Sequence, residues 1–248
     1  MASFGIEGIR YFPNLRATGL VTKAEDLTYV FNICNGLDRE LRNAGHTRRF
    51  YWANRDCWEI DLHSSGLGGA DDDWADDVDL FFILTHGNND AGNAILAYDI
   101  KINEWIGNSG NWRLGNVNCE WLLIYGCKTV DLANPLSFWD VFQRLHQLCG
   151  AWDNMWDGVT TDEVGEDVGD NLTDGDTVVT SWIDGVSDWW VDNHPIVIAA
   201  ERESTWNGGA PLWASTTMNR DHLWGHGTTV GDIFPASKFW LSWRWAEG

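Results

Sequence analysis

A histidine and a cysteine that each follow an apolar run are the residues of this chain best suited to do chemistry. Residues 78–87 read Val-Asp-Leu-Phe-Phe-Ile-Leu-Thr-His-Gly and end in His86 and Gly87. Residues 119–128 read Cys-Glu-Trp-Leu-Leu-Ile-Tyr-Gly-Cys-Lys and place Cys127 after a second apolar run. A cysteine thiolate is a nucleophile, and a nearby imidazole can activate it and then protonate a leaving amine. The two residue types therefore predict a Cys–His dyad for acyl transfer.

The two apolar runs must bring these side chains together. Both runs are strand-length and lack apolar/polar alternation, which is typical of parallel strands buried on both faces. In an open α/β sheet, chemistry takes place beyond the carboxyl ends of the strands. If the strands are neighbours, about 4.8 Å apart, side chains at both ends can reach one substrate atom. Taken singly, each signal has a plain alternative, because such a histidine is more often structural and a lone cysteine usually packs in a core.

Acyl transfer also needs donors for the oxyanion and a pocket for the substrate. The backbone amides of Gly87 and Cys127 are the candidate donors, since glycine lets a backbone approach the substrate closely. Asp131 follows the cysteine and is a candidate for a substrate-binding pocket that selects Arg or Lys. The alternative for Asp131 is an N-terminal cap of the following helix.

The remaining pattern predicts an α/β fold with a mostly parallel sheet flanked by helices. We find no repeat or linker, so residues 1–248 are expected to form a single domain. A capping box at residues 22–25 favours a helix start there, and Gly45 favours its end. The predicted strands are residues 4–12, 48–58 (with residues 58–62 as a possible extension), 78–87, 119–128, 194–200 and an edge strand at 239–245, and the predicted helices are residues 22–45, 135–150, 161–172 and 176–190.

Charge is the strongest compositional signal. Thirty-seven acidic residues face sixteen basic ones, for a net charge of −21, and only four residues are lysine. An acidic, lysine-poor surface is typical of halophile cytoplasm, where salt screens self-repulsion, and an ordinary acidic protein is the alternative. Nucleic acid is not expected as a partner, because phosphate binding needs clustered Lys and Arg. A basic peptide would be attracted.

Other sequence features limit where the protein is expected to be located and which cofactors it is expected to bind. The chain has no apolar stretch long enough for a membrane span and no recognisable signal peptide, so we expect a cytoplasmic protein without membrane contact. Five cysteines without a CxxC pair argue against disulfides and structural zinc. We expect no cofactor and no metal. The alternatives are calcium at the acidic residues 71–77, for which a solvated loop is the plainer interpretation, and a metal at His222 and His226, where we favour a loop.

The two strand endings resemble the caspase–legumain–gingipain superfamily of cysteine peptidases, clan CD. Its members carry a hydrophobic block before a His-Gly pair and another before the nucleophilic cysteine, and residues 79–87 and 121–127 match this pattern. The resemblance implies a caspase-haemoglobinase-like three-layer sandwich, with His86 as the catalytic histidine, Cys127 as the nucleophile and Gly87 as an oxyanion contributor. The caspase pentapeptide Gln-Ala-Cys-Arg-Gly is absent, because Cys127 lies within Tyr-Gly-Cys-Lys-Thr.

Three further segments resemble an uncharacterised prokaryotic domain family related to that superfamily. They are residues 115–122, 142–146 and 223–227, and this wider similarity carries no established activity. Two functions follow as hypotheses. The first is a cysteine endopeptidase or related acyl-transfer hydrolase that acts on a peptide or protein, with a preference for basic residues as a further expectation. The second is a catalytically silent binding or self-assembly module that uses some of the eighteen tryptophans as a contact surface, which would make the protein a homo-oligomer.

Overall fold

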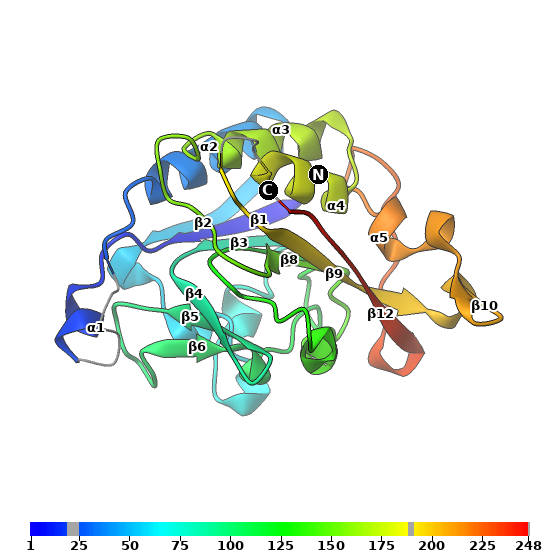
Figure 1. The fold of residues 1–248 in the computed structure, drawn as a ribbon, viewed down its shortest axis with the longest axis horizontal. Helices are drawn as coiled ribbons and strands as arrows, with labels where there is room; N and C mark the ends of the chain where they lie inside the picture. The colour runs from blue at the N-terminus through cyan, green and yellow to red at the C-terminus, as the bar shows by residue number, and fades with distance from the viewer. Residues whose placement is uncertain (19–24, 188–190, 248) are drawn as a thin grey trace.

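A seven-stranded sheet occupies the centre of the computed structural model, which describes residues 1–18, 25–187 and 191–247 (Figure 1). Its strand order is β2-β1-β3-β7-β8-β9-β12. The first five strands in this order run parallel, β9 is antiparallel to β8, and β12 is antiparallel to β9. The strands are β1 (Ser3–Gly8), β2 (Thr47–Ala53), β3 (Leu80–Leu84), β7 (Trp121–Tyr125), β8 (Gln147–Ala151), β9 (Pro195–Arg202) and β12 (Lys238–Trp245).

Helices and short strands flank this sheet. A three-stranded sheet has the order β4-β5-β6, and β10 pairs with β11. The short strands are β4 (Gly87–Asp90), β5 (Asn93–Ala97), β6 (Ile106–Asn108), β10 (Trp206–Asn207) and β11 (Ala210–Pro211). The helices are α1 (Pro13–Ala17), α2 (Val30–Asn43), α3 (Val164–Asp174), α4 (Val178–Val186) and α5 (Thr217–Arg220). None of the helices within the described ranges has the length and apolarity needed to cross a bilayer.

The central strands bury both of their faces. In β3, Leu80, Phe82 and Leu84 belong to one apolar cluster, and Phe81 and Ile83 to another on the opposite face. Successive side chains of a strand point to opposite faces, so a strand covered on both sides must be apolar at every position. This is why β3 and β7 lack alternation in their sequences.

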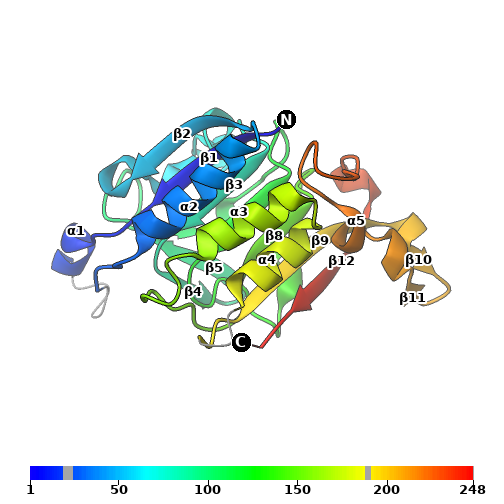
Figure 2. The same cartoon turned by 90° about the horizontal axis from the view of Figure 1, so that it is seen from above.

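Helices α2, α3 and α4 form the layer over one face of the sheet, where they lie side by side (Figure 2). Helices α2 and α3 touch through their backbones, because a Cβ atom at Gly165 would lie only 1.8 Å from the carbonyl oxygen of Ile33. Glycine at this crossing therefore sets the spacing of the helical layer.

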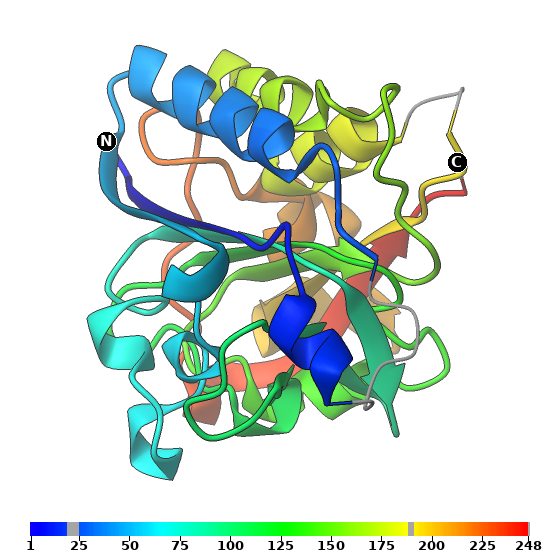
Figure 3. The same ribbon diagram turned by 90° about the vertical axis from the view of Figure 1, so that its left-hand side faces the viewer.

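The opposite face is covered by loops, short strands and short helical turns rather than by long helices (Figure 3). Strands β4–β6, α1 and short 3-10 turns supply this layer, and its core includes the buried side chains of Trp112, Phe138 and Phe142. The α/β fold with a mostly parallel central sheet is thus confirmed, and the third layer contains much less α-helix than the two-sided helical cover expected from the sequence.

Most of the predicted elements are confirmed. The apolar runs that end at His86 and Cys127 form the neighbouring strands β3 and β7. The strand predicted from residue 194 is β9, and the predicted edge strand is β12. The helices predicted at residues 161–172 and 176–190 are α3 and α4, although residues 188–190 lie outside the described residues.

The helix predicted at residues 135–150 is wrong. The chain forms a short 3-10 helix over Pro135–Asp140 and then enters β8, which pairs with β7 and β9. A short apolar run has the same composition in a buried strand as on one side of a helix, so periodicity could not separate the two. Strand pairing determines the structure of this segment, because β8 forms the strand between β7 and β9.

Several element boundaries also differ from the prediction, and strand β1, predicted to reach residue 12, ends at Gly8. Helix α2 begins at Val30, and the predicted capping box falls largely on residues 22–24, outside the described residues. Strand β2 ends at Ala53, before the predicted end at residue 58, and Asn54 has a φ of 52°. The extension predicted for residues 58–62 is wrong, because Glu59–Asp61 is a 3-10 helix.

Candidate active site

His86 and Cys127 come from the carboxyl ends of neighbouring parallel strands. Leu84 of β3 pairs in register with Tyr125 of β7, so the chain leaves both strands at the same level. Each candidate lies two residues beyond its strand, and both side chains are half-buried. Both line one pocket of about 150 Å³. The structure thus brings the two predicted side chains to a shared opening at the edge where an α/β sheet places its chemistry.

The imidazole of His86 is held on two sides. Its Nε2 atom lies 2.7 Å from the carbonyl oxygen of Glu25, and the ring of Phe12 packs against it with centroids 4.9 Å apart. A carbonyl oxygen only accepts hydrogen bonds, so this contact requires the hydrogen on Nε2. The neutral ring then carries its lone pair on Nδ1, which is the form that can accept a proton from a thiol.

The thiol of Cys127 rests against the backbone of Met155. The Met155 amide nitrogen lies 3.3 Å from Sγ and donates to it, and the Met155 carbonyl oxygen lies 3.4 Å away as an acceptor for the thiol hydrogen. Within the described residues, no hydrogen bond joins Sγ to the imidazole of His86. An amide donor stabilises a thiolate, so Met155 already provides part of the environment that a nucleophilic sulfur needs.

Cys127 differs from the other cysteines in its exposure. It is half-buried, whereas the remaining four are fully buried. Burial raises the pKa of each of these four thiols, which keeps them protonated and unreactive. The four buried residues are Cys34, Cys57, Cys119 and Cys149.

Two glycines allow the strand ends to approach each other. A Cβ atom at Gly87 would lie 2.5 Å from the carbonyl oxygen of Cys127 and 3.0 Å from its amide nitrogen. A Cβ atom at Gly126 would lie 2.9 Å from the carbonyl oxygen of Thr85. Only glycine fits at either position without displacing the neighbouring backbone. The role of the Gly87 amide as an oxyanion donor stays a prediction.

The turn after the cysteine has an unusual backbone. Lys128 has a φ of 52°, in the left-handed region that non-glycine residues seldom adopt. Its amide donates to the carbonyl oxygen of Asp153 at 2.8 Å, and its ammonium group lies 3.4 Å from the carboxylate of the same residue. These contacts hold the sharp turn that carries Cys127 away from the sheet.

The acidic group of the pocket is one that the sequence did not indicate. Asp157 lines the pocket, and its carboxylate accepts the amide of Tyr29 at 2.7 Å and that of Thr28 at the start of α2. Tyr125 steadies this wall, because its hydroxyl donates to the carbonyl oxygen of Trp156 at 2.7 Å. The lining residues are Leu27, Leu84, Thr85, His86, Tyr125, Gly126, Cys127, Met155, Trp156 and Asp157.

Asp131 does not line this pocket. Its carboxylate accepts the amide of Ala133 at 2.9 Å, and its carbonyl oxygen accepts the amide of Asn134 at 3.0 Å. These are the contacts of a turn that leads into the 3-10 helix at Pro135, which agrees with the alternative of a capping role. The substrate-binding role of Asp131 stays a prediction.

The acidic loop at residues 71–77 is more buried than expected. Asp71 and Asp76 are fully buried, and oxygen atoms of Asp71, Asp72 and Asp76 lie within 4.8 Å of one another. The Asp76 carboxylate accepts three amides of the loop before β7, those of Gly115, Val117 and Cys119, at 2.8–3.0 Å. The solvated loop predicted for this stretch is therefore wrong for its buried members, which anchor backbone.

His222 and His226 lie in a loop, as predicted, and have different partners. Nδ1 of His222 lies 3.0 Å from the carbonyl oxygen of Gly175, and Nε2 of His226 lies 2.9 Å from Nε2 of His46. The two histidines therefore do not converge on one point.

The tryptophans divide between the core and the surface. In the described part of the chain, Trp112, Trp121 and Trp182 are fully buried. Core packing therefore explains only part of the tryptophan content, and Trp189 and Trp190 lie outside the described residues. Trp52, Trp58 and Trp74 line a second pocket of about 180 Å³. The exposed ones are Trp139, Trp156, Trp206, Trp213, Trp224, Trp243 and Trp245.

Comparisons with known proteins identify a family and two similar structures. A family model described as a domain of unknown function (DUF6345) matches residues 6–247, and no curated protein matches the chain. A secreted C11 cysteine protease from Bacteroides thetaiotaomicron, "iotapain", is similar with a TM-score of 0.45 and 10% identity, over 79% of this chain and 65% of that one. The Drosophila initiator caspase Dronc is similar with a TM-score of 0.36 and 12% identity, over 69% and 63%. The chain therefore spans slightly less than two thirds of either solved chain.

Proposed function

Since the chain belongs to the DUF6345 family, a family of unknown function, we propose its activity from its own chemistry: it is a cysteine-type acyl hydrolase that cleaves peptides. One observation carries this proposal. Cys127 and His86 leave neighbouring parallel strands at the same level and line one pocket, and the carbonyl oxygen of Glu25 holds the imidazole in the tautomer that can accept a proton.

The reaction begins with proton transfer from the thiol. Nδ1 of His86 takes the hydrogen of the Cys127 thiol, while Nε2 keeps its hydrogen and continues to donate it to the Glu25 carbonyl oxygen. The thiolate adds to the substrate carbonyl carbon, and the amides of Gly87 and Cys127 donate to the resulting oxyanion. Nδ1 then returns its proton to the leaving amine as the C–N bond breaks, which leaves a thioester on Cys127.

A water molecule completes the cycle. Nδ1 of His86 takes a proton from this water, which attacks the thioester carbonyl, and the carboxylic acid leaves as the Cys127 sulfur is released. The imidazolium returns its proton to the sulfur. The enzyme ends in its starting state, and no oxidant or cofactor is required.

The pocket walls favour a basic substrate side chain. Leu27 and Trp156 supply an apolar surface for the methylene groups of an Arg or Lys, and Asp157 supplies a negative charge beyond it. The amides of Thr28 and Tyr29 already bind the Asp157 carboxylate, so its charge is held in place rather than neutralised. A net charge of −21 also attracts basic peptides over a longer range.

Covalent labelling tests this proposal. The full chain is treated with a peptidyl acyloxymethyl ketone that carries arginine next to the reactive group, and the adducts are mapped by mass spectrometry. We expect one adduct, on Cys127, and hydrolysis of the matching peptide substrate that is lost in Cys127→Ala. The four buried cysteines serve as internal controls. A Cys127 that reacts no faster than free cysteine, with hydrolysis unchanged in Cys127→Ala, would overturn the proposal.

A second candidate function is self-assembly through the edge of the sheet. Strand β12 is the last strand of the sheet, and its side chains Phe239, Trp243 and Trp245 are 49%, 41% and 45% exposed. An edge strand with exposed aromatics can pair with a second copy. Light scattering tests this: we expect a dimer that Trp243→Asp converts to a monomer, and a monomeric wild type would contradict it.

A further inference from the structure

A second cluster of chemically capable side chains lies at the other end of the sheet. Glu120 and His146 directly precede β7 and β8, and the His146 amide donates to the Glu120 carbonyl oxygen at 2.8 Å. Asp232 reaches the same place from the segment before β12. One ligand atom of each of these three side chains lies within 4.8 Å of the other two. Cys127 follows β7 at its opposite end, roughly 20 Å away at the rise of a strand.

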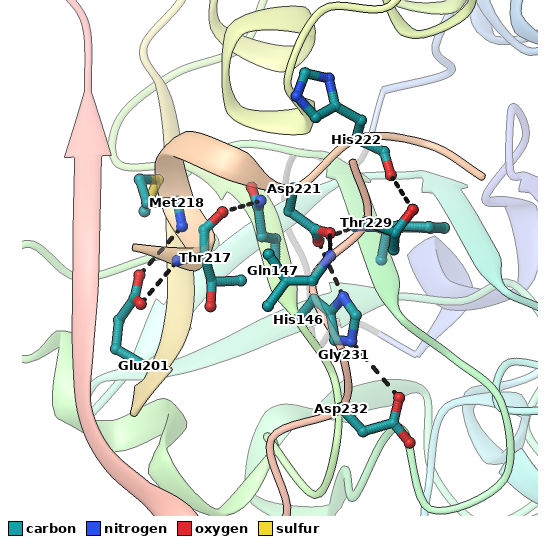
Figure 4. A network of polar contacts seen from close by, with 12 residues as sticks. His146, Gln147, Glu201, Thr217, Met218, Asp221, His222, Thr229, Gly231 and Asp232 are labelled. Carbon is teal, nitrogen blue, oxygen red and sulfur yellow. Dashed lines mark hydrogen bonds and ion pairs between the residues drawn. The ribbon is translucent and has the colours of Figure 1, made fainter. Parts of the chain in front are cut away.

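A buried carboxylate fixes the orientation of His146. Nδ1 of His146 lies 3.0 Å from Oδ2 of Asp221, and both side chains are fully buried. Asp221 is itself held by the indole nitrogen of Trp121 at 2.7 Å and the amide of Val230 at 2.9 Å. Figure 4 shows the imidazole between two carboxylates, with Asp221 at Nδ1 and Asp232 beyond Nε2. Nε2 is therefore directed at the cluster.

Two buried atoms of the cluster lack a hydrogen-bond partner. Within the described residues, Nε2 of His146 and Oε2 of Glu120 are both buried without one. Oδ1 of Asp232 lies 3.8 Å from Nε2, which is too long for a hydrogen bond. Buried polar atoms are nearly always paired, and an unpaired nitrogen facing two carboxylates is the arrangement that a bound cation would satisfy.

We propose that Glu120, His146 and Asp232 bind a divalent transition-metal ion such as Mn²⁺ or Zn²⁺. One imidazole nitrogen and two carboxylates suit first-row transition ions, whereas Mg²⁺ and Ca²⁺ prefer oxygen ligands alone. Ligand atoms around such an ion lie roughly 3–3.5 Å apart, so the side chains need a small inward movement, for which the half-exposed Asp232 has room. Asp221 at Nδ1 is the outer carboxylate that metal-binding histidines typically have.

The site is accessible and its charge suits a divalent ion. Glu120 and Asp232 line a polar pocket of about 110 Å³, which leaves space for water on the ion. Arg144 lies 3.7 Å from Oδ2 of Asp232, so it contacts the oxygen that faces away from His146. Once a metal ion has displaced the protons of the site, the neutral imidazole, the three ionised carboxylates of Glu120, Asp221 and Asp232, and this guanidinium sum to two negative charges, which a divalent cation balances.

A proton is the competing occupant of Nε2. Burial is the largest single influence and lowers the pKa of His146, but the hydrogen bond and charge of Asp221, together with Asp232 and Glu120, outweigh burial and raise the pKa to about 10. The experiment must therefore separate an imidazolium ion that is paired with Asp232 from an imidazole that is bound to a metal.

Manganese binding by the full chain makes this separation. Chelator-treated protein is titrated with Mn²⁺, and free Mn²⁺ is followed by electron paramagnetic resonance. We expect one strongly bound ion per chain, which a tenfold excess of Mg²⁺ does not displace, and a rise in the unfolding temperature on binding. We expect Glu120→Gln and Asp232→Asn each to weaken binding at least tenfold. No binding at millimolar Mn²⁺ would mean that only a proton occupies the site and would overturn the proposal.

Matched variants locate the ion. Asp72→Asn alters the separate cluster of Asp71, Asp72 and Asp76, so this variant is expected to bind Mn²⁺ with unchanged affinity. A loss of binding in Asp72→Asn alone would show that the ion binds at that cluster and would overturn the proposal. Asp232→Asn changes a half-exposed side chain and is expected to fold, so equal Mn²⁺ affinity in it and the wild type would also overturn the site. Because the cluster lies at the far end of β7, alkylation of Cys127 is expected to proceed at the same rate with and without Mn²⁺.

Discussion

Nε2 of His86 lies 2.7 Å from the carbonyl oxygen of Glu25, a residue sixty-one positions earlier in the chain. This backbone oxygen acts as the third member of the candidate site, because it fixes which nitrogen of His86 carries hydrogen. A carbonyl group comes from the backbone of any residue, so no side-chain type at position 25 could have revealed it. It also ties the site to the segment that leads into α2.

Replacing His86 is expected to slow the chemistry of Cys127. In His86→Gln, the thiol loses its proton acceptor, so peptide hydrolysis should fall by about 10²–10⁴-fold. The initial rates of hydrolysis measure this. His194→Gln is the matched control, because His194 precedes β9 at the same edge of the sheet and does not line the pocket. Equal losses in the two variants would show that His86 has no special role.

Gly87→Ala is expected to damage both stability and activity. The new Cβ atom would lie 2.5 Å from the carbonyl oxygen of Cys127, so the two strand ends must separate. We expect the free energy of unfolding to fall by about 1–3 kcal/mol and hydrolysis to be lost. Urea unfolding and peptide cleavage measure the two effects. Gly66→Ala is the control, since the nearest atom to its Cβ is 3.6 Å away; a similar loss there would refute the steric explanation.

Replacing Asp157 is expected to change substrate preference, and replacing Asp131 is not. Asp157→Asn removes the charge in the pocket wall, so kcat/KM for a peptide with arginine at the cleavage site should fall at least tenfold relative to a neutral peptide. Asp131→Asn changes a turn outside the pocket and should leave this ratio unchanged. If the ratio falls in Asp131→Asn instead, the substrate-binding role predicted from the sequence is the correct one.

The His46–His226 pair is expected to make stability depend on pH. Burial, and then the neighbouring His226, lower the pKa of His46 to about 4, and its Nδ1 accepts the amide of Ala2 at 2.8 Å. In the unfolded chain, His46 takes up a proton near pH 6.5, whereas the folded protein resists it until about pH 4. The stability contributed by neutral His46 is therefore complete above pH 6.5 and is lost as the pH falls towards 4.

Urea unfolding at pH 7.5, 5.5 and 4 measures this effect. Between the first and last pH, the wild type should lose about 1–2 kcal/mol more than His46→Asn, in which the amide oxygen can replace Nδ1 as an acceptor. This is less than the full value of the shift, because the half-exposed His226 leaves the pair partly screened. Parallel pH profiles for the two proteins would contradict the prediction.

Salt is expected to stabilise the protein through screening. At a net charge of −21, the acidic side chains repel one another. Raising the salt concentration from 0.1 to 1 M shortens the screening length from about 10 to about 3 Å and so weakens this repulsion. The unfolding temperature should therefore rise over this range, as in the halophile interpretation of the composition. Screening depends on ionic strength alone, so the rise should be the same in NaCl and in KCl. An unfolding temperature that stays constant between 0.1 and 1 M salt would contradict the prediction and favour an ordinary acidic protein.

Much of the sheet that positions the candidate site could be predicted from the sequence. Strands β3 and β7 are buried on both faces, so every position is apolar, and this local signal marks where each strand ends. His86 and Cys127 each lie two residues beyond those ends. Their nearness follows from the parallel pairing of the two strands.

The failures share one cause, which is that long-range packing overrides local pattern. Residues 135–150 satisfy a helical spacing, yet β8 forms there because the sheet offers a place between β7 and β9. The acidic side chain that lines the pocket, Asp157, comes from another segment of the chain, and the substrate-binding role of Asp131 stays a prediction. Proximity in sequence is a poor guide once the chain has left a strand.

Sequence alone thus determined which residues can take part in a reaction and which strands carry them, because a strand buried on two faces must be apolar at every position. The tertiary structure decided what surrounds those residues. The Glu25 carbonyl, the pocket wall at Met155–Asp157, and the meeting of Glu120, His146 and Asp232 all join distant segments. Such contacts depend on how the whole chain packs around the sheet, and no local pattern records them.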